Sequence, residues 1–251
     1  MKQRRFAPGI CAICGLALLL FSAMASAGTA EDFAVANRSY ADGDYAGARH
    51  AYERALADGP RVNVMYNLGN AFFRLGDPGR ASLEYERVLA LQLRHPDATA
   101  NLKLVRDKSG ARLIEEPWWM RGLLWLPAGT ATAIAIGACW FFLLLAGLTA
   151  WKKRGAARLL AAVLGALLAA GYAAGVCWAA GERGRIAIVV AARAEGRSEP
   201  AERSPVLETL PAGSSVRLLG GQAGWTYCRL PGGQRGWLPP STVEPLVPSA
   251  K

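Results

Sequence analysis

The chain has 251 residues, of which 52% are hydrophobic, and a formal net charge of +10 at neutral pH. This length allows one or two domains. The charge raises nucleic-acid binding as a function, but the basic residues gather beside apolar segments rather than along one folded face, which argues against it. With only two histidines and no nucleophile–base pairing or phosphate-binding loop, we predict neither an enzyme nor a metal or cofactor site.

The N-terminus has the pattern of a secretory signal peptide. A basic start precedes an apolar run over residues 10–24, and small residues then occupy positions −3 and −1 before Gly28. We therefore predict that residues 1–27 are removed. A cut after Ala30 and an uncleaved anchor helix are the alternatives.

A helical unit recurs with a period of 33 residues in the region 28–110. Gly43-Asp44 corresponds to Gly76-Asp77, and Ala48 corresponds to Ala81. A period of this length is typical of a helical solenoid, in which each helix pair buries its apolar face against the next copy. An ordinary helical hairpin with coincidental Ala/Gly spacing is the alternative.

The second copy, with Asn67-Leu68-Gly69-Asn70, Gly76-Asp77, Ala81 and Tyr85, resembles a tetratricopeptide repeat. A further first helix near Asn101 lacks a partner and suits a capping helix. The resemblance implies an all-α solenoid that binds an extended peptide or a helix on the face lined by first helices. Predicted partner-binding residues are Asn37, Tyr40, Tyr66, Asn67, Asn70, Phe73 and Arg74.

The chemistry of these side chains suits a peptide. Asparagine amides both donate and accept hydrogen bonds, and Arg74 offers a planar fork for a carboxylate. The carboxylate clamp known in this family adds basic residues, at positions held here by Phe33, Asp97 and Asn101. We therefore do not expect that ligand class.

Two uncharged apolar segments, residues 128–150 and 159–180, each exceed the roughly 20 residues that cross a bilayer core. The basic linker 151–158 places this loop in the cytoplasm and both flanking regions outside. We read residues 111–127 as an interfacial aromatic segment, with a dedicated aromatic ligand site as the alternative. Small residues that we expect to form helix contacts are Gly129, Ala133, Gly137, Gly171 and Gly175.

Residues 181–251 have short β-type runs separated by glycine-rich turns. Leu210 to Gly213, Gly224-Trp225 and Gly233 to Trp237 resemble a bacterial SH3-like domain, although the stretch around Arg197 departs from it. The resemblance implies a small all-β barrel that binds peptide or glycopeptide of the cell wall. Its candidate groove residues are Trp225, Tyr227 and Trp237, which filling of the barrel core would also explain.

The order of segments thus predicts a multidomain membrane protein: an all-α tetratricopeptide-repeat solenoid, a two-helix transmembrane hairpin and a small all-β SH3-like barrel. This order resembles the repeat-containing component of the bacterial aerotolerance (Bat) operon. The resemblance implies an inner-membrane scaffold for envelope stress, with both folded domains in the periplasm and von Willebrand factor A-domain membrane proteins as partners. A cell-wall (peptidoglycan or peptide) binding protein and an assembly factor are the alternatives.

Overall fold

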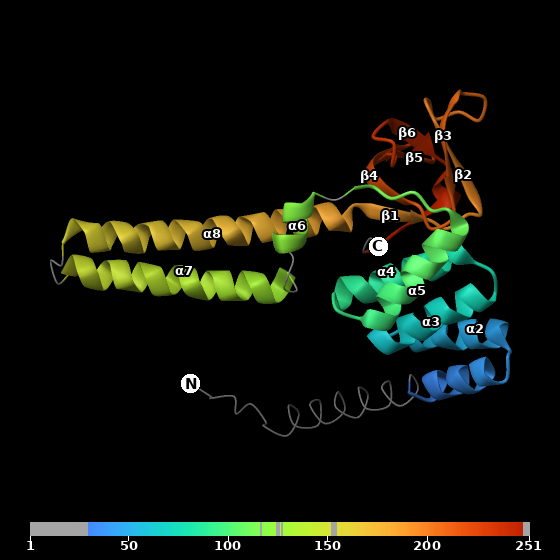
Figure 1. Cartoon of the computed structure of the whole chain (residues 1–251), viewed down its shortest axis with the longest axis horizontal. Helices are drawn as coiled ribbons and strands as arrows, with labels where there is room; N and C mark the ends of the chain where they lie inside the picture. The colour runs from blue at the N-terminus through green and yellow to red at the C-terminus, as the bar shows by residue number, and fades with distance from the viewer. Residues whose placement is uncertain (1–29, 116, 124–125, 127, 152–154, 248–251) are drawn as a thin grey trace, which may run out of the picture. The chain divides into compact units, whose positions relative to one another are not determined.

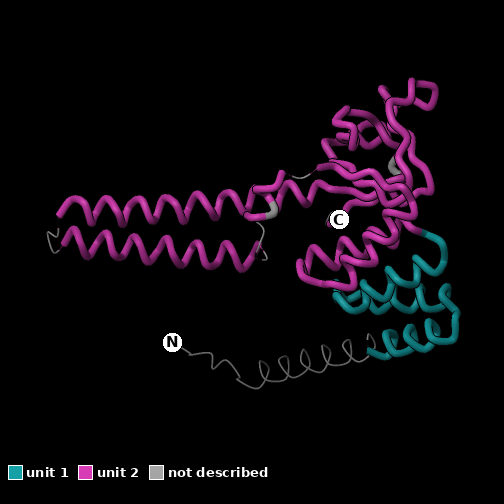
Figure 2. Tube along the Cα trace, in the orientation of Figure 1, with its two compact units in different colours: residues 1–77 teal, residues 78–251 magenta. Residues whose placement is uncertain are grey.

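The computed structural model describes residues 30–115, 117–123, 126, 128–151 and 155–247 (Figure 1). The predicted signal peptide, Trp125 and three of the four basic residues of the predicted cytoplasmic loop (152–154) lie outside the described residues. The chain divides into two compact units, residues 1–77 and residues 78–251 (Figure 2). This boundary falls inside the predicted repeat domain.

Unit 1 (residues 1–77) is helical throughout its described part. Residues 30–41 form a helix, which α2 (Tyr45–Ala55) and α3 (Val62–Arg74) follow. Gly43 adopts a φ of +81° in the first turn, a conformation that glycine takes without strain. Asp44 then caps α2 by accepting a hydrogen bond from the Gly47 amide. Ala48 and Tyr52 are buried in its core, as the repeat pattern predicts.

Unit 2 (residues 78–251) begins with the helix pair α4 (Pro78–Leu91) and α5 (Pro96–Ser109). The His95 ring accepts a hydrogen bond from the Ala98 amide and caps α5. Arg106 pairs with Glu86 of α4 across 2.6 Å. The sequence predicts a further first helix that lacks the second helix of its repeat. That helix is α5, and it packs against α4 of the preceding copy.

Two long helices follow a short one, α6 (Trp118–Leu123). Helices α7 (Ala128–Trp151) and α8 (Ala156–Gly184) pack together as an antiparallel hairpin (Figure 1). Their most apolar windows have mean hydropathies of 2.2 and 2.1, and only 17% of each window is buried. A core helix of a soluble protein would be mostly buried, so these helices are long, apolar and exposed enough to cross a membrane.

The contact between α7 and α8 uses other small residues than the sequence predicts. Gly129, Gly137 and Gly171 are exposed, and a Cβ added at any of them would meet nothing within 4 Å. Instead, the Phe142 ring lies where a Cβ on Gly165 would stand. The predicted stripes are wrong for this pair, because alanine-rich helices carry small residues on several faces. The small residues buried along the hairpin include Ala131, Ala135, Ala146, Ala162 and Ala166.

Helix α6 lies against α8. Met120 is 2% exposed in a cluster with Val176 and Ala179, and the Trp119 ring stacks on Trp178 with centroids 5.7 Å apart. Trp118 is exposed, as an interfacial tryptophan would be.

An antiparallel seven-stranded sheet completes unit 2, in the order β3-β2-β6-β5-β4-β1-β7. Its first strand follows α8 almost directly (Figure 1). The core on one face contains Val216, Cys228, Leu230 and Leu238. The strands are β1 (Ile186–Val189), β2 (Arg193–Arg197), β3 (Val206–Pro211), β4 (Ser215–Gln222), β5 (Trp225–Arg229), β6 (Arg235–Leu238) and β7 (Val243–Pro245).

Helix α4 packs on this sheet along its outermost strand. Arg87 donates hydrogen bonds to the carbonyl oxygens of Pro245 and Leu246, at 3.3 and 3.2 Å, and pairs with the buried Glu84. The backbone of Gly79 approaches β1 so closely that an added Cβ would stand 2.6 Å from the Val190 carbonyl oxygen. The α4 side chains thereby cover carbonyl groups that an edge strand would otherwise expose.

The segment after α5 joins the same packing. The Arg112 amide donates to the Ser214 hydroxyl and the Ile114 amide donates to the Ser215 hydroxyl. In return, the Ser215 amide donates to the Arg112 carbonyl at 3.0 Å. Residues that precede the two apolar helices and residues that follow them therefore fold together.

Substituting Gly79 tests this packing. We expect Gly79→Val to lower the free energy of unfolding of unit 2 by about 2 kcal/mol, because the added atoms meet backbone that cannot move aside. The matched control is Ala46→Val, at the equivalent position of the first copy, where the residue is exposed. Thermal unfolding of the purified chain measures both. Equal effects of the two substitutions would show that the close approach is absent.

The buried thiol of Cys228 gives a second prediction. Burial raises its pKa from 9.0 to about 12. The unfolded chain loses this proton near pH 9, so the thiol's contribution to stability is full below pH 9 and falls as the pH rises toward 12. In a variant whose other cysteines are serine, we expect alkylation at pH 9 to be several hundredfold slower in the native than in the unfolded chain, roughly as the thiolate fractions differ. Equally fast alkylation of both states would contradict this prediction.

Candidate functional site

The predicted partner-binding asparagines of unit 1 form a fixed network. The Asn37 carbonyl oxygen accepts hydrogen bonds from the Tyr52 hydroxyl at 2.8 Å and from the Asn67 amide at 3.1 Å. The Tyr52 ring is buried and holds this network against the core. With its oxygen occupied twice, the exposed Asn37 side chain presents its NH₂ group as a donor for a ligand carbonyl.

Arg74 is oriented by two tyrosines. Its guanidinium lies 4.5 Å from the centre of the Tyr45 ring, and Tyr40 contacts Tyr45 edge-on at 5.1 Å. Burial raises the pKa of Tyr40, and the neighbouring Arg74 charge and its hydrogen bond to the hydroxyl partly oppose that rise. Stacking limits the conformations of the exposed arginine, so less entropy is lost when its fork binds a carboxylate.

The other predicted residues of unit 1 lie on α3. Tyr66 lies near Tyr40, and Asn70 and Phe73 are half-buried with contacts inside the chain. Tyr45 was not predicted, because it lies on a second helix and the sequence argument considered only first helices. We call Asn37, Tyr40, Tyr45, Asn67 and Arg74 the unit 1 cluster.

The three predicted aromatic residues of the SH3-like region share one face of the sheet. Tyr227 lies directly opposite Trp237, with ring centroids 4.7 Å apart. Trp225 precedes Tyr227 by two residues and thus points to the same side of β5. All three are half-exposed, whereas the alternating Cys228 is buried. They therefore line the face opposite the core.

Next to these rings lies a row of three arginines that the sequence analysis missed. Arg217, Arg229 and Arg235 are paired in register across β4, β5 and β6. Glu182 at the end of α8 approaches Arg217 at 3.6 Å, but among the described residues no acidic side chain pairs with Arg229 or Arg235. Like charges directly opposite each other are unfavourable, so the row suits an external anion.

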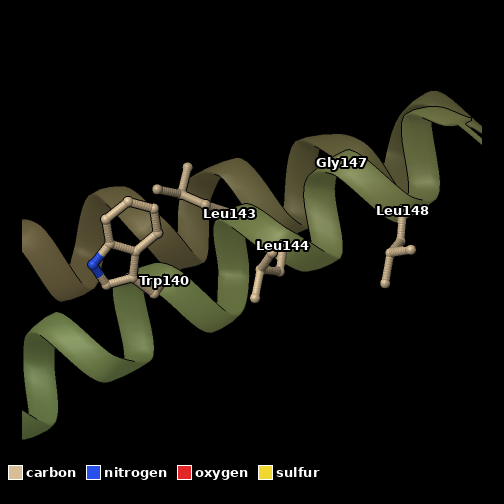
Figure 3. A pocket seen from close by; sticks show the side chains of 5 residues that line it. All are labelled: Trp140, Leu143, Leu144, Gly147 and Leu148. Atoms are coloured by element: carbon tan, nitrogen blue, oxygen red, sulfur yellow. The ribbon is translucent and has the colours of Figure 1, made fainter.

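A hollow of about 370 Å³ on α7 has a different character (Figure 3). Its side chains project from a single helix and provide no acid, base or cation. In the part of the chain that the structure describes, no three His, Cys, Asp or Glu side chains group in a way that would hold a metal ion. The residues that line the hollow are Trp140, Leu143, Leu144, Gly147 and Leu148.

Comparison with known families identifies two regions. Residues 33–94 match the model of the tetratricopeptide repeat, and residues 197–244 match the model of the bacterial SH3 domain. No curated protein matches the chain. The predictions of a repeat region and an SH3-like region are thus confirmed, whereas the resemblance to the aerotolerance component stays a prediction. The chain combines a tetratricopeptide-repeat region, two apolar helices and an antiparallel SH3-like sheet region.

Proposed function

We propose that the chain is a membrane-anchored scaffold that captures a protein partner on its tetratricopeptide-repeat helices. Repeats of this kind act as protein-binding surfaces. The observation that carries the proposal is the unit 1 cluster, in which hydrogen-bond donors are held in place by buried or stacked tyrosines. Such preorganised groups lose little entropy when a ligand binds.

The cluster fits a peptide segment with an acidic side chain. The Asn37 NH₂ group would donate to a backbone carbonyl, and the Arg74 fork would bind the carboxylate. The Tyr40 and Tyr45 rings beside Arg74 offer apolar surface to neighbouring side chains. Binding therefore needs no catalytic group, and we propose a scaffold rather than an enzyme.

The fold also supports a location for the scaffold. Helices α7 and α8 would cross the inner membrane as a hairpin, so the chain on either side of them would lie in the same compartment. The contacts of α4 with Pro245 and Leu246 require that arrangement. Together with the basic loop 151–158 and the N-terminal signal pattern, this supports a periplasmic location for both folded regions.

For the partner, we propose membrane proteins with von Willebrand factor A domains, in an aerotolerance or envelope-stress complex. The support is the order of segments in the chain, which resembles the repeat-containing component of the Bat operon. The tetratricopeptide match by itself supports a protein partner of unspecified class.

The test is affinity purification from solubilised membranes with Asn70→Ala and Arg74→Ala combined. We expect this variant to lose the partner by roughly 30-fold in affinity, as for removal of a hot-spot residue worth about 2 kcal/mol. Mass spectrometry identifies the captured proteins, and circular dichroism checks that the helices remain folded.

The matched control is Arg38→Ala, which removes the same charge from an exposed site on the helix of residues 30–41. We expect it to retain the partner. Retention of the partner by the Asn70 and Arg74 variant, with its helices intact, would rule out this face as the docking site.

A second candidate function is cell-wall binding through the SH3-like region. The observation that favours it is the half-exposed aromatic set Trp225, Tyr227 and Trp237 on one face, since sugar rings and peptides stack on such side chains. Co-sedimentation of the detergent-solubilised chain with purified peptidoglycan tests it. Pelleting that Trp225→Ala abolishes would favour this function, and a chain that stays in solution would exclude it.

A further inference from the structure

The β4–β5 hairpin lies on the side of the sheet from which α8 enters. Helix α8 ends at Gly184 and β1 begins at Ile186, which is paired with Arg217. The Leu218 amide donates to the Arg185 carbonyl at 2.7 Å. Because β4 runs antiparallel to β1, its residues beyond Leu218 extend back toward α8. The turn at Ala223 is therefore on the α8 side.

The junction between helix and sheet is held by ion pairs. Glu182 in the last turn of α8 contacts Arg185 at 3.0 Å and Arg217 at 3.6 Å. Both Glu182 and Arg217 have side chains about one-sixth exposed, at 15% and 16%. This pairing holds the arginine row close to the end of α8, because no loop separates α8 from β1.

The face of the sheet near the end of α8 carries both positively charged side chains and aromatic rings. The arginine row carries three guanidinium groups, of which Arg229 and Arg235 have no acidic partner among the described residues. Trp225, Tyr227 and Trp237 lie on the same face, one step along the strands. At membrane surfaces, arginine binds lipid phosphates, while tryptophan and tyrosine rings lie at the level of the headgroups.

We propose that this face rests on the membrane that α7 and α8 cross. Arg229 and Arg235 bind phosphates of anionic lipid headgroups, and Trp225, Tyr227 and Trp237 lie among those headgroups. The proposal depends on the membrane insertion stated under the proposed function. It assigns the aromatic face to lipid, because α8 holds that face close to the bilayer surface and no linker lets it reach away.

The experiment places a fluorophore at the hairpin turn. Ala223→Cys is made in a chain whose native cysteines are replaced, and the labelled protein is reconstituted into vesicles carrying a headgroup-level quencher. One vesicle type is phosphatidylcholine alone, and the other contains roughly a quarter phosphatidylglycerol, enough to make the surface anionic. Labels at Glu202, in the exposed loop between β2 and β3, and at Leu144 on α7 report an exposed loop and the inserted helix.

We expect the label at position 223 to be quenched in the anionic vesicles and much less in the neutral ones. Arg229→Gln with Arg235→Gln should lower the equilibrium constant for lipid contact by about 30-fold, since each arginine near an anionic surface contributes on the order of a 5-fold preference. The matched control, Arg193→Gln with Arg203→Gln, removes the same charge from exposed positions on and beyond β2 and should leave quenching unchanged.

Two results would overturn the proposal. The first is an unquenched label at 223 in anionic vesicles while the label at 144 is in lipid. The second is an aqueous label at 144, which would show that the hairpin does not insert and would remove the proposed membrane anchor as well. The label at 144 therefore separates failure of the inference from failure of the anchor.

Discussion

The packing of α4 on the edge of the sheet is the contact on which the architecture of unit 2 depends. Arg87 satisfies two carbonyl groups at Pro245 and Leu246, and Gly79 lets the helix backbone reach the backbone at Val190. A half-buried arginine that lost these acceptors would be left with unsatisfied donors, which is costly. The contact also joins chain that precedes α7 to chain that follows α8. The chain before α7 and the chain after α8 must therefore lie on the same side of any membrane that the hairpin crosses.

The two repeat copies differ at the positions that make this contact. Gly79 and Ser82 of α4 correspond to Ala46 and Arg49 of α2. Arg49 is only partly buried, whereas Ser82 is fully buried. Small residues allow α4 to approach another backbone, and a long charged one at the same place keeps a helix surface solvated. The tetratricopeptide framework is thus retained in both copies, while a few substitutions adapt one of its helices to the SH3-like region.

Local patterns predicted most elements of this fold, because helices, turns and apolar spans are determined by neighbouring residues. The Gly43-Asp44 turn and the glycine-rich turns of the sheet are examples. Contacts between distant segments were harder to predict from the sequence. The arginine row, for example, can be recognised only when the register of Arg217, Arg229 and Arg235 is known. Tyr45 was not among the predicted site residues, because its stacking on Arg74 depends on how α2 and α3 pack. The prediction that a small-residue stripe on α7 contacts α8 was wrong, because composition does not select one helix face among several.

In-cell photo-crosslinking tests most directly whether unit 1 captures a protein while the SH3-like face contacts lipid. A benzophenone amino acid replaces Tyr66 on α3 in one strain and Trp225 on β5 in another. We expect an adduct with another membrane protein from position 66 and no protein adduct from position 225. A protein adduct from position 225, with none from position 66, would contradict this expectation and would assign partner binding to the SH3-like sheet.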